Sequence, residues 1–285
     1  MTERKIYSRN STFQHFMTLK TNRNKRYKAG EFLVEGVRSI NEAVKNNWQI
    51  RSFLYDKNNL SGWAREKIDS VRTKENFLLT PELMGELSEK DDSSELMAVI
   101  GMRDDSPDSI RLSENPFLVL FDRPSNKGNL GTMIRSCDAL GADALIITGH
   151  AVDMYDPNVV VSAMGSFFNM QVIRAEDNGA LMSFIASLRE KYPGFITVGT
   201  TAHREKPLYE TDLTRPLLLM MGNETMGLSA AFKESCDVLC SIPMAEGSYA
   251  SSFNVSCAAS IIMYEITRQR NSGVRWQEMI TWKRS

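Results

Sequence analysis

Three loops carry the side chains that could do chemistry, and each of them follows a short run of apolar residues. The first loop follows residues 117–121 and reads DRPSNKGNLG. Gly128 and Gly131 let the backbone turn tightly or approach a ligand. Arg135 lies off the apolar stripe of the helix that begins near Leu130, so it is not simply packed between the helix and a sheet. A plain strand-to-helix turn with an exposed arginine would read the same way.

The second loop follows residues 217–221 and reads GNETMGLS. It places a carboxylate, Glu224, between two flexible glycines, Gly222 and Gly227. A hairpin turn would also produce this pattern, so the loop by itself does not identify a site.

The third loop follows the apolar residues 238–242, where Pro243 ends the predicted strand. Small residues then lead to Ser252 and Asn254, and a helical apolar stripe begins at Val255. A hydroxyl and an amide at the start of a helix are equally typical of an ordinary N-cap.

The elements that must position these loops are strands of a parallel sheet. Apolar runs of strand length recur through the C-terminal half, mostly separated by helical periodicity or loop residues: 117–121, 144–148, 170–173, 195–198, 217–221 and 238–242. Strands that are apolar throughout and alternate with helices predict a parallel sheet covered on both faces. Such sheets bind ligands in the loops beyond the carboxyl ends of their strands.

The first hundred residues predict a separate, small α/β unit. Residues 50–55 and 96–102 read as strands, with a helix at about 62–71 between them. From residue 103 to 116 the sequence becomes polar and proline-bearing, which is typical of a linker. We therefore expect domains at 1–105 and 117–285, joined by a linker at 106–116.

The net charge is −1, but the charge is unevenly distributed: both ends of the sequence are basic and the middle is acidic. Residues 1–30 carry eight lysines and arginines against Glu3, and residues 266–285 carry five against Glu278. Basic segments of this kind suit a surface that follows nucleic-acid phosphates, and we expect a basic N-terminal arm that docks RNA. Two solvated termini would give the same composition.

Composition favours a cytoplasmic protein. No apolar run approaches the length of a membrane helix, and the N-terminal residues lack the apolar segment of a signal peptide. The four cysteines are expected to be small buried hydrophobes. Cys236 and Cys240 have neither a histidine nor a second cysteine pair beside them, so we expect no metal.

Taken together and in this order, the three loops resemble the signature motifs of the SpoU/TrmH family of RNA 2′-O-methyltransferases in the SPOUT superfamily. The matching residues are, motif by motif, Asn129, Gly131 and Arg135; Gly222, Glu224 and Gly227; and Ile242, Pro243, Met244 and 252–256. The N-terminal segment also looks like the small substrate-binding domain of that family. Phe253 departs from the family's usual leucine, and the stretch from Met244 to Asn254 is slightly longer than the common form.

This resemblance implies a C-terminal parallel-sheet SPOUT domain with a deep trefoil knot, preceded by a small α/β substrate-binding domain. It implies S-adenosyl-L-methionine as the cofactor, RNA (ribosomal or transfer) as the substrate, and a homodimer formed through the knot region. The residues that it assigns to the cofactor are Gly222, Asn223, Gly227, Ile242, Met244 and Phe253.

The resemblance further implies that Arg135 is central to methyl transfer onto a ribose 2′-hydroxyl. Arginine has a reference pKa above ~12, so a neutral guanidine that acts as the base would be costly. We expect instead that Arg135 engages the target phosphate or ribose and stabilises the developing oxyanion. The residues expected to orient it or the substrate are Asn129, Glu224, Ser252 and Asn254.

Two other classes of protein fit parts of the sequence. A non-catalytic RNA-binding protein derived from the same fold would keep the architecture, and residues 128–131 match the GXXG loop of KH modules. A KH module would leave the other two loops unexplained. An ordinary doubly wound nucleotide enzyme would need a G-x-G-x-x-G or G-x-x-x-x-G-K-[ST] loop, and neither occurs in the sequence.

Overall fold

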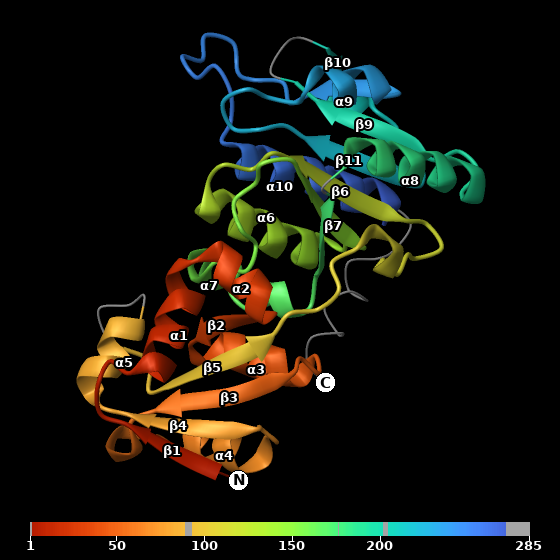
Figure 1. The fold of residues 1–285 in the computed structure, drawn as a ribbon. Coiled ribbons are helices and arrows are strands. Elements are labelled where there is room, and N and C mark those ends of the chain that lie inside the picture. The colour runs from red at the N-terminus through yellow and green to blue at the C-terminus, as the bar shows by residue number, and fades with distance from the viewer. Residues whose placement is uncertain (1, 89–92, 176, 202–204, 272–285) are drawn as a thin grey trace. The chain divides into compact units, whose positions relative to one another are not determined.

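A computed structural model describes residues 2–88, 93–175, 177–201 and 205–271. The chain divides into two compact units that do not follow the chain order (Figure 1). The first unit comprises residues 1–104, 126–135 and 152–170, and the second comprises 105–125, 136–151 and 171–285. The stretch predicted as a linker belongs to the second unit, where Ile110 and Leu112 pack against the core.

The first unit contains a five-stranded mixed sheet in the order β1-β4-β3-β5-β2. Its strands are β1 (Thr2–Ile6), β2 (Glu31–Glu35), β3 (Ile50–Tyr55), β4 (Glu75–Leu79) and β5 (Leu96–Gly101). Its helices are α1 (Ser11–Thr21), α2 (Arg23–Ala29), α3 (Val37–Lys45), α4 (Gly62–Ser70), α5 (Pro81–Leu87) and α7 (Pro157–Ser162). β1, β4 and β3 run parallel, whereas β5 is antiparallel to both of its neighbours.

Helix α1 forms because Asn10 caps it and its apolar residues share one face. The Asn10 side chain accepts a hydrogen bond from the Phe13 amide at 3.0 Å. Phe13, Phe16 and Leu19 are buried against the sheet, together with residues of α5 and the facing strand positions. This apolar layer fixes α1 on one face of the sheet.

An aromatic cluster joins residues 152–170 to the five-stranded sheet. Phe32 of β2 lies 4.9 Å from Tyr155 and 5.9 Å from both Trp48 and Phe167, measured between ring centroids. The Trp48 ring N–H donates to the Phe168 carbonyl at 2.8 Å. Because these rings are buried, this later stretch of chain is part of the core of the first unit.

The basic residues near the N-terminus, where we expected an arm that docks RNA, belong to folded elements of the first unit. Residues 2–29 form β1, α1 and α2, and Arg26 is only 1% exposed. Its guanidinium pairs with Asp153 at 2.6 Å and donates to the carbonyls of Leu19 and Lys20. A buried charge requires such partners. Part of the positive charge in this segment is therefore neutralised by a buried ion pair.

The second unit is built on a seven-stranded sheet in the order β10-β12-β9-β11-β6-β7-β8, in which every described pairing is parallel. The strands are β6 (Phe117–Asp122), β7 (Ala144–Thr148), β8 (Gln171–Ala175), β9 (Ile196–Thr200), β10 (Lys206–Pro207), β11 (Leu217–Met221) and β12 (Val238–Ser241). The predicted parallel α/β sheet is confirmed. Strands 144–148 and 217–221 have the predicted limits, but β1, β2, β4 and β10 were not predicted.

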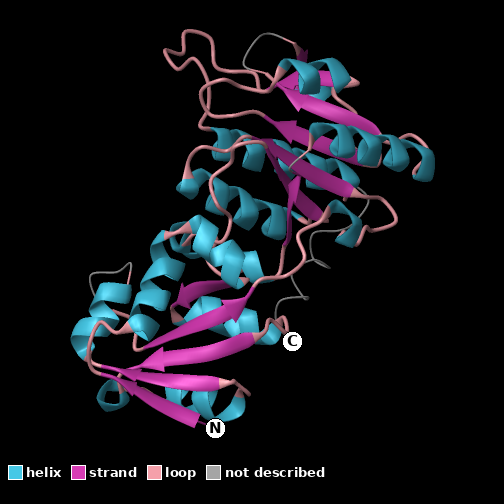
Figure 2. Ribbon diagram, viewed as in Figure 1, coloured by secondary structure: helices cyan, strands magenta, loops and turns pink. Residues whose placement is uncertain are grey.

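Helices cover both faces of this sheet (Figures 1 and 2). Helices α8 (Asn178–Lys191) and α9 (Ala230–Ser235) pack on the face lined by Leu118, Leu120 and Leu218. On the other face, α6 (Lys127–Leu140) and α10 (Val255–Arg270) meet through Cys137 and Met263, whose sulfurs are 3.9 Å apart. The Thr267 hydroxyl also donates to the Leu140 carbonyl at 2.9 Å. The central strands are therefore buried on both sides, as their uninterrupted apolar sequences require.

Within the described residues, no helix has the length and apolar character needed to cross a membrane.

Replacing Arg26 by alanine should destabilise the protein by about 3–5 kcal/mol, because Asp153 would be left buried without its partner. Urea unfolding followed by circular dichroism measures this change. Lys25→Ala removes an exposed cation from the same helix and should stay within about 0.5 kcal/mol of the wild type. Equal stabilities for the two variants would contradict a structural role for the buried pair.

Candidate functional site

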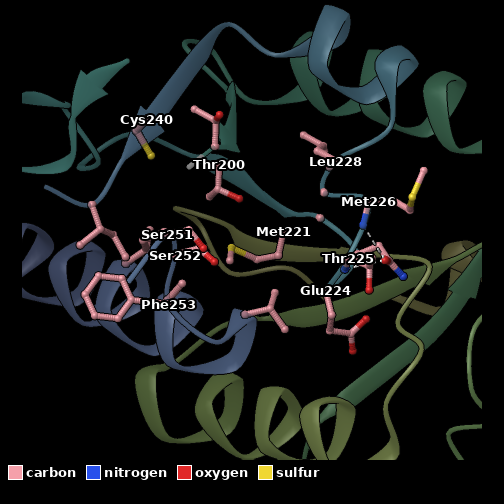
Figure 3. Close-up of a pocket in the computed structure, with 18 of the residues that line it drawn as sticks. Thr200, Met221, Glu224, Thr225, Met226, Leu228, Cys240, Ser251, Ser252 and Phe253 are labelled. Carbon is pink, nitrogen blue, oxygen red and sulfur yellow. Dashed lines mark hydrogen bonds between the residues drawn. The ribbon is translucent and has the colours of Figure 1, made fainter. Parts of the chain in front are cut away.

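A pocket of about 340 Å³ opens at the carboxyl ends of β9, β11 and β12 in the second unit (Figure 3). Thr200, Met221 and Cys240 mark these strand ends, and the start of α10 closes another side. The remaining lining residues are Thr201, Gly222, Asn223, Glu224, Thr225, Met226, Gly227, Leu228, Lys233, Ile242, Met244, Ser251, Ser252, Phe253, Val255, Ala258 and Ile262. The pocket lies where a parallel sheet is expected to bind its ligand.

The loop after β11 is closed on itself. Asn223 and Gly227 exchange backbone hydrogen bonds of 3.1 and 3.0 Å, and the Asn223 side-chain oxygen accepts from the amides of Thr225 and Met226. Gly227 has a φ of +66°, which favours glycine. A Cβ on Gly222 would lie 2.1 Å from the Leu228 nitrogen, so this position has no space for a side chain.

A buried carboxylate holds this loop in place. Asp122, at the end of β6, accepts hydrogen bonds from the Arg123 guanidinium, the Thr148 hydroxyl and the Ser229 amide, at 2.9–3.0 Å. The Arg123 guanidinium also donates to the Gly227 carbonyl at 3.2 Å, and its own carbonyl accepts from the Asn223 amide group at 2.7 Å. The hydrogen bond to Asp122 raises the pKa of Arg123 above its usual value. Both ends of the loop are thus fastened to the strand end of β6.

Arg123 adopts a left-handed backbone conformation, with φ of +52°, although it is not a glycine. Such a conformation costs about 1–3 kcal/mol and persists only where the surroundings enforce it. The two hydrogen bonds to Asp122 and those to the loop supply that enforcement. We infer that this strain is kept because it aims both the side chain and the carbonyl of Arg123 at the loop.

Glu224 connects the second loop to the first. Its carboxylate accepts hydrogen bonds from the Ser125 amide at 3.1 Å and the Ser125 hydroxyl at 2.7 Å. Among the residues that the structure describes, the only other charged group that lines the pocket is Lys233, so these residues offer one carboxylate and one ammonium group. It can accommodate a molecule with an apolar body and a polar, charged end.

The third loop ends in an N-cap. The Asn254 side chain accepts from the amides of Ser256 at 2.9 Å and Cys257 at 3.4 Å, and so starts α10. Further along α10, the hydroxyls of Ser260 and Ser136 are 2.8 Å apart, which ties this helix to α6. Phe253 is 42% exposed at the pocket rim, where Figure 3 places it beside Ser251 and Ser252.

The pocket gathers most of the predicted site residues, although they come from distant parts of the sequence. Those that line it are Gly222, Asn223, Glu224, Gly227, Ile242, Met244, Ser252 and Phe253. Asn129, Arg135 and Asn254 do not line it. Asn129 and Arg135 lie on α6, in the stretch that groups with the first unit, and Arg135 is exposed. Its guanidinium pairs with no carboxylate among the residues the structure describes.

Sequence analysis missed several residues that line the pocket, notably Thr200, Thr201, Leu228, Lys233 and Cys240. The two threonines could have been predicted, because they follow the strand expected at 195–198 and ligands bind at the carboxyl ends of parallel strands. Burial raises the pKa of the Cys240 thiol to about 11, so at neutral pH it is a neutral, apolar part of the wall.

The expectation that all four cysteines are buried is wrong for Cys257, which is exposed on α10. No cluster of His, Cys, Asp and Glu suited to a metal ion occurs among the described residues.

Two family models match the chain. The model of the SpoU rRNA methylase family matches residues 116–264, and that of the SpoU L30e-like domain matches residues 10–98. The first match covers more than half of the chain and includes all three loops.

Individual proteins are similar over nearly the whole chain. A 23S rRNA (uridine(2479)-2′-O)-methyltransferase of Streptomyces viridochromogenes is 47% identical over 272 residues, which cover 95% of this chain and 94% of the relative. A 23S rRNA (guanosine(2553)-2′-O)-methyltransferase of Bacillus subtilis is 28% identical over 86% of this chain and 91% of its own. The crystal structure of the SpoU methyltransferase AviRb from S. viridochromogenes with AdoMet is similar at a TM-score of 0.88, with 46% identity over 93% of this chain and 99% of that chain.

Replacing Gly222 by alanine should destabilise the protein by about 1–3 kcal/mol, because the added methyl group would overlap the backbone of the returning loop. Gly62→Ala is a matched control: a Cβ there meets nothing within 4 Å, at the start of α4. It should leave stability unchanged or raise it slightly. Thermal and urea unfolding measure both effects, and a Gly222 variant as stable as the control would show that the loop can move aside.

Proposed function

The chain belongs to the SpoU rRNA methylase family, and on this premise we propose that it methylates the 2′-hydroxyl of a ribose in 23S rRNA, using S-adenosylmethionine. The observation that carries the proposal is the gathering of two of the three family loops and the end of β9 around one pocket. Two relatives that are similar to most of this chain are named as 23S rRNA methyltransferases, which supports ribosomal rather than transfer RNA as the substrate. The relative with 47% identity acts on uridine, so we propose a uridine as the target.

The residues of the pocket fit this cofactor. Met221, Leu228, Ile242 and Ala258 give apolar walls for an adenine ring, and backbone amides at the strand ends are available as partners. Gly222 lets the returning backbone at Gly227 and Leu228 pack directly against it, which shapes this side of the pocket. When bound, S-adenosylmethionine supplies an activated methyl group, so what remains for the protein is positioning and electrostatics.

Arg135 is proposed to bind the target phosphate or ribose and to stabilise the charge that develops on the attacking oxygen. Its exposure on α6 and its lack of a carboxylate partner within the described residues support this role. Glu224, held by Ser125, and Ser252 at the pocket wall are proposed to orient the substrate. Asn129 is proposed to act with Arg135, and Asn254 to act by fixing the start of α10.

Residues 1–105 are proposed to bind the RNA, with residues 106–116 leading into the methyltransferase domain at 117–285. The match of the L30e-like model to residues 10–98 supports these limits. A deep trefoil knot in the C-terminal domain remains a prediction from the family. We also place the enzyme in the cytoplasm, where it would meet ribosomal RNA.

A homodimer through α10 is supported by an exposed stripe on that helix. Cys257, Ile261 and Tyr264 follow one another at spacings of four and three residues, so they share a face. Ile261 is 38% exposed and Tyr264 is 50% exposed. Apolar side chains of this size gathered on one helix face are typical of a subunit interface.

Incubation with S-adenosylmethionine and unmodified 23S rRNA, followed by mapping of 2′-O-methylated positions, tests the proposed function. The wild type should modify one site, and Arg135→Ala should lower the rate at least about 100-fold, as expected for a lost electrostatic stabiliser. Calorimetry should show S-adenosylmethionine affinity within a few-fold of the wild type.

Arg65→Ala, an exposed arginine on α4, is the control and should keep the full transfer rate. Loss of cofactor binding in Arg135→Ala would make that residue a cofactor ligand or a structural residue instead. RNA binding by the wild type without any transfer would favour the non-catalytic alternative.

Ile261→Lys should convert the dimer to a monomer, because it would bury an unpaired charge in the proposed interface. Sedimentation velocity measures the change. Val37→Lys alters an exposed apolar residue on α3 and should leave the dimer intact. A wild type that is monomeric and active would contradict the dimer.

A further inference from the structure

A second hollow, of about 700 Å³, lies in the first unit and takes no part in the site described above. We call it the strand-start groove, because it lies where β3 and β4 begin. It is lined by Thr12, His15 and Phe16 of α1, by Glu31, Gln49, Ile50, Arg51, Ser52 and Val99, and by Arg72, Thr73, Lys74, Glu75 and Phe77. We propose that this groove binds a single-stranded segment of the RNA substrate, which rests on the proposed function.

The rim of the groove is basic. Arg72 and Lys74 lie just before β4 and are exposed, and neither makes an ion pair or a side-chain hydrogen bond within the part of the chain that the structure describes. Arg4 lies on the neighbouring strand β1 and is exposed. In the parallel pairing of β1 with β4 it stands opposite Phe77, and partners in register point to the same face of a sheet. The cations therefore line one side of the hollow, as phosphate contacts require.

The negative charge inside the groove is already neutralised. Glu31 accepts from Arg51 at 2.8 Å and lies 3.1 Å from the His15 ring nitrogen. The hydrogen bond from His15 is the largest effect that lowers the pKa of Glu31, and the charge of Arg51 adds to it, against the effect of burial. Glu31 thus serves to hold Arg51 and His15 in position. Glu75 is the other acidic residue that lines the groove, and Arg72 and Lys74 are the basic residues outside the Glu31–Arg51 pair.

The walls and the size of the groove favour unpaired nucleotides. Gln49, Ser52, Thr12 and Thr73 provide hydrogen-bonding side chains, whereas the apolar floor consists of buried residues such as Phe77. A hollow of this volume has room for a base and its sugar, which a duplex would not insert. Proteins read RNA sequence mainly on such splayed single strands.

The groove adds to the exposed positive charge of the N-terminal segment, part of which is paired within the fold. Arg26 is buried on Asp153, and Arg9 pairs with Glu86. The exposed cations that line this groove outside the Glu31–Arg51 pair are Arg72 and Lys74, which lie well beyond the first thirty residues.

The test is the double variant Arg72→Ala/Lys74→Ala, with binding to an unmodified 23S rRNA transcript measured at several salt concentrations. Loss of two phosphate contacts should weaken binding about ten-fold and reduce the slope of log affinity against log salt by about 1.4. In the transfer assay the KM for RNA should rise while kcat at saturating RNA stays the same. S-adenosylmethionine affinity and melting temperature should match the wild type, since both side chains are exposed.

Lys45→Ala/Arg65→Ala is the matched control, because it also removes one lysine and one arginine, from α3 and α4. It should retain the affinity, salt slope and KM of the wild type. The groove is excluded if the Arg72/Lys74 variant behaves like the wild type, or if the control loses as much affinity. A wild type that transfers no methyl group would instead overturn the proposed function, and a synthetic acidic peptide that competes with the transcript at the groove would indicate a protein partner.

Discussion

The buried carboxylate of Asp122 is the interaction on which the cofactor side of the molecule depends. It is 1% exposed, and its hydrogen-bond donors come from the ends of β6 and β7 and from the loop after β11. A buried carboxylate is costly unless its lone pairs are satisfied, so these three segments are held in one arrangement. Arg123 also holds the loop that lines the pocket, through its hydrogen bonds with Gly227 and Asn223.

A comparable constraint acts in the first unit, where Arg26 and the aromatic cluster hold residues 152–170 against the five-stranded sheet. Asp156 accepts from Lys127 at 2.9 Å, and Arg26 lies 3.7 Å from the same carboxylate. The start of α6, with Asn129 two residues after Lys127, is therefore connected to the N-terminal fold. Helix α6 continues into the second unit, so a single helix carries residues of both.

Much of the architecture could be predicted from the sequence, because the central strands are apolar on both faces. Short uninterrupted apolar runs such as 144–148 and 217–221 are typical of strands in a parallel sheet that is buried on both faces. β1 was missed because it is an edge strand whose first four residues are exposed, so it carries no apolar pattern. β10 is only two residues long. The burial of Arg26 could not be predicted, because composition does not distinguish a solvated arginine from one whose partner is 127 residues away.

By itself, the sequence determined the class of the sheet, the three loops and the family to which they belong, since these depend on residue types and local spacing. Tertiary structure alone decided that the Asn223 side chain donates to the Arg123 carbonyl and that Asp122 accepts from the Ser229 amide. It also decided that Thr200, Lys233 and Cys240 line the same pocket as Glu224, and that Arg72 and Lys74 line one groove of the first unit with residues of α1. These facts depend on which distant segments meet, and hydrogen bonds between segments a hundred residues apart leave no local pattern to read.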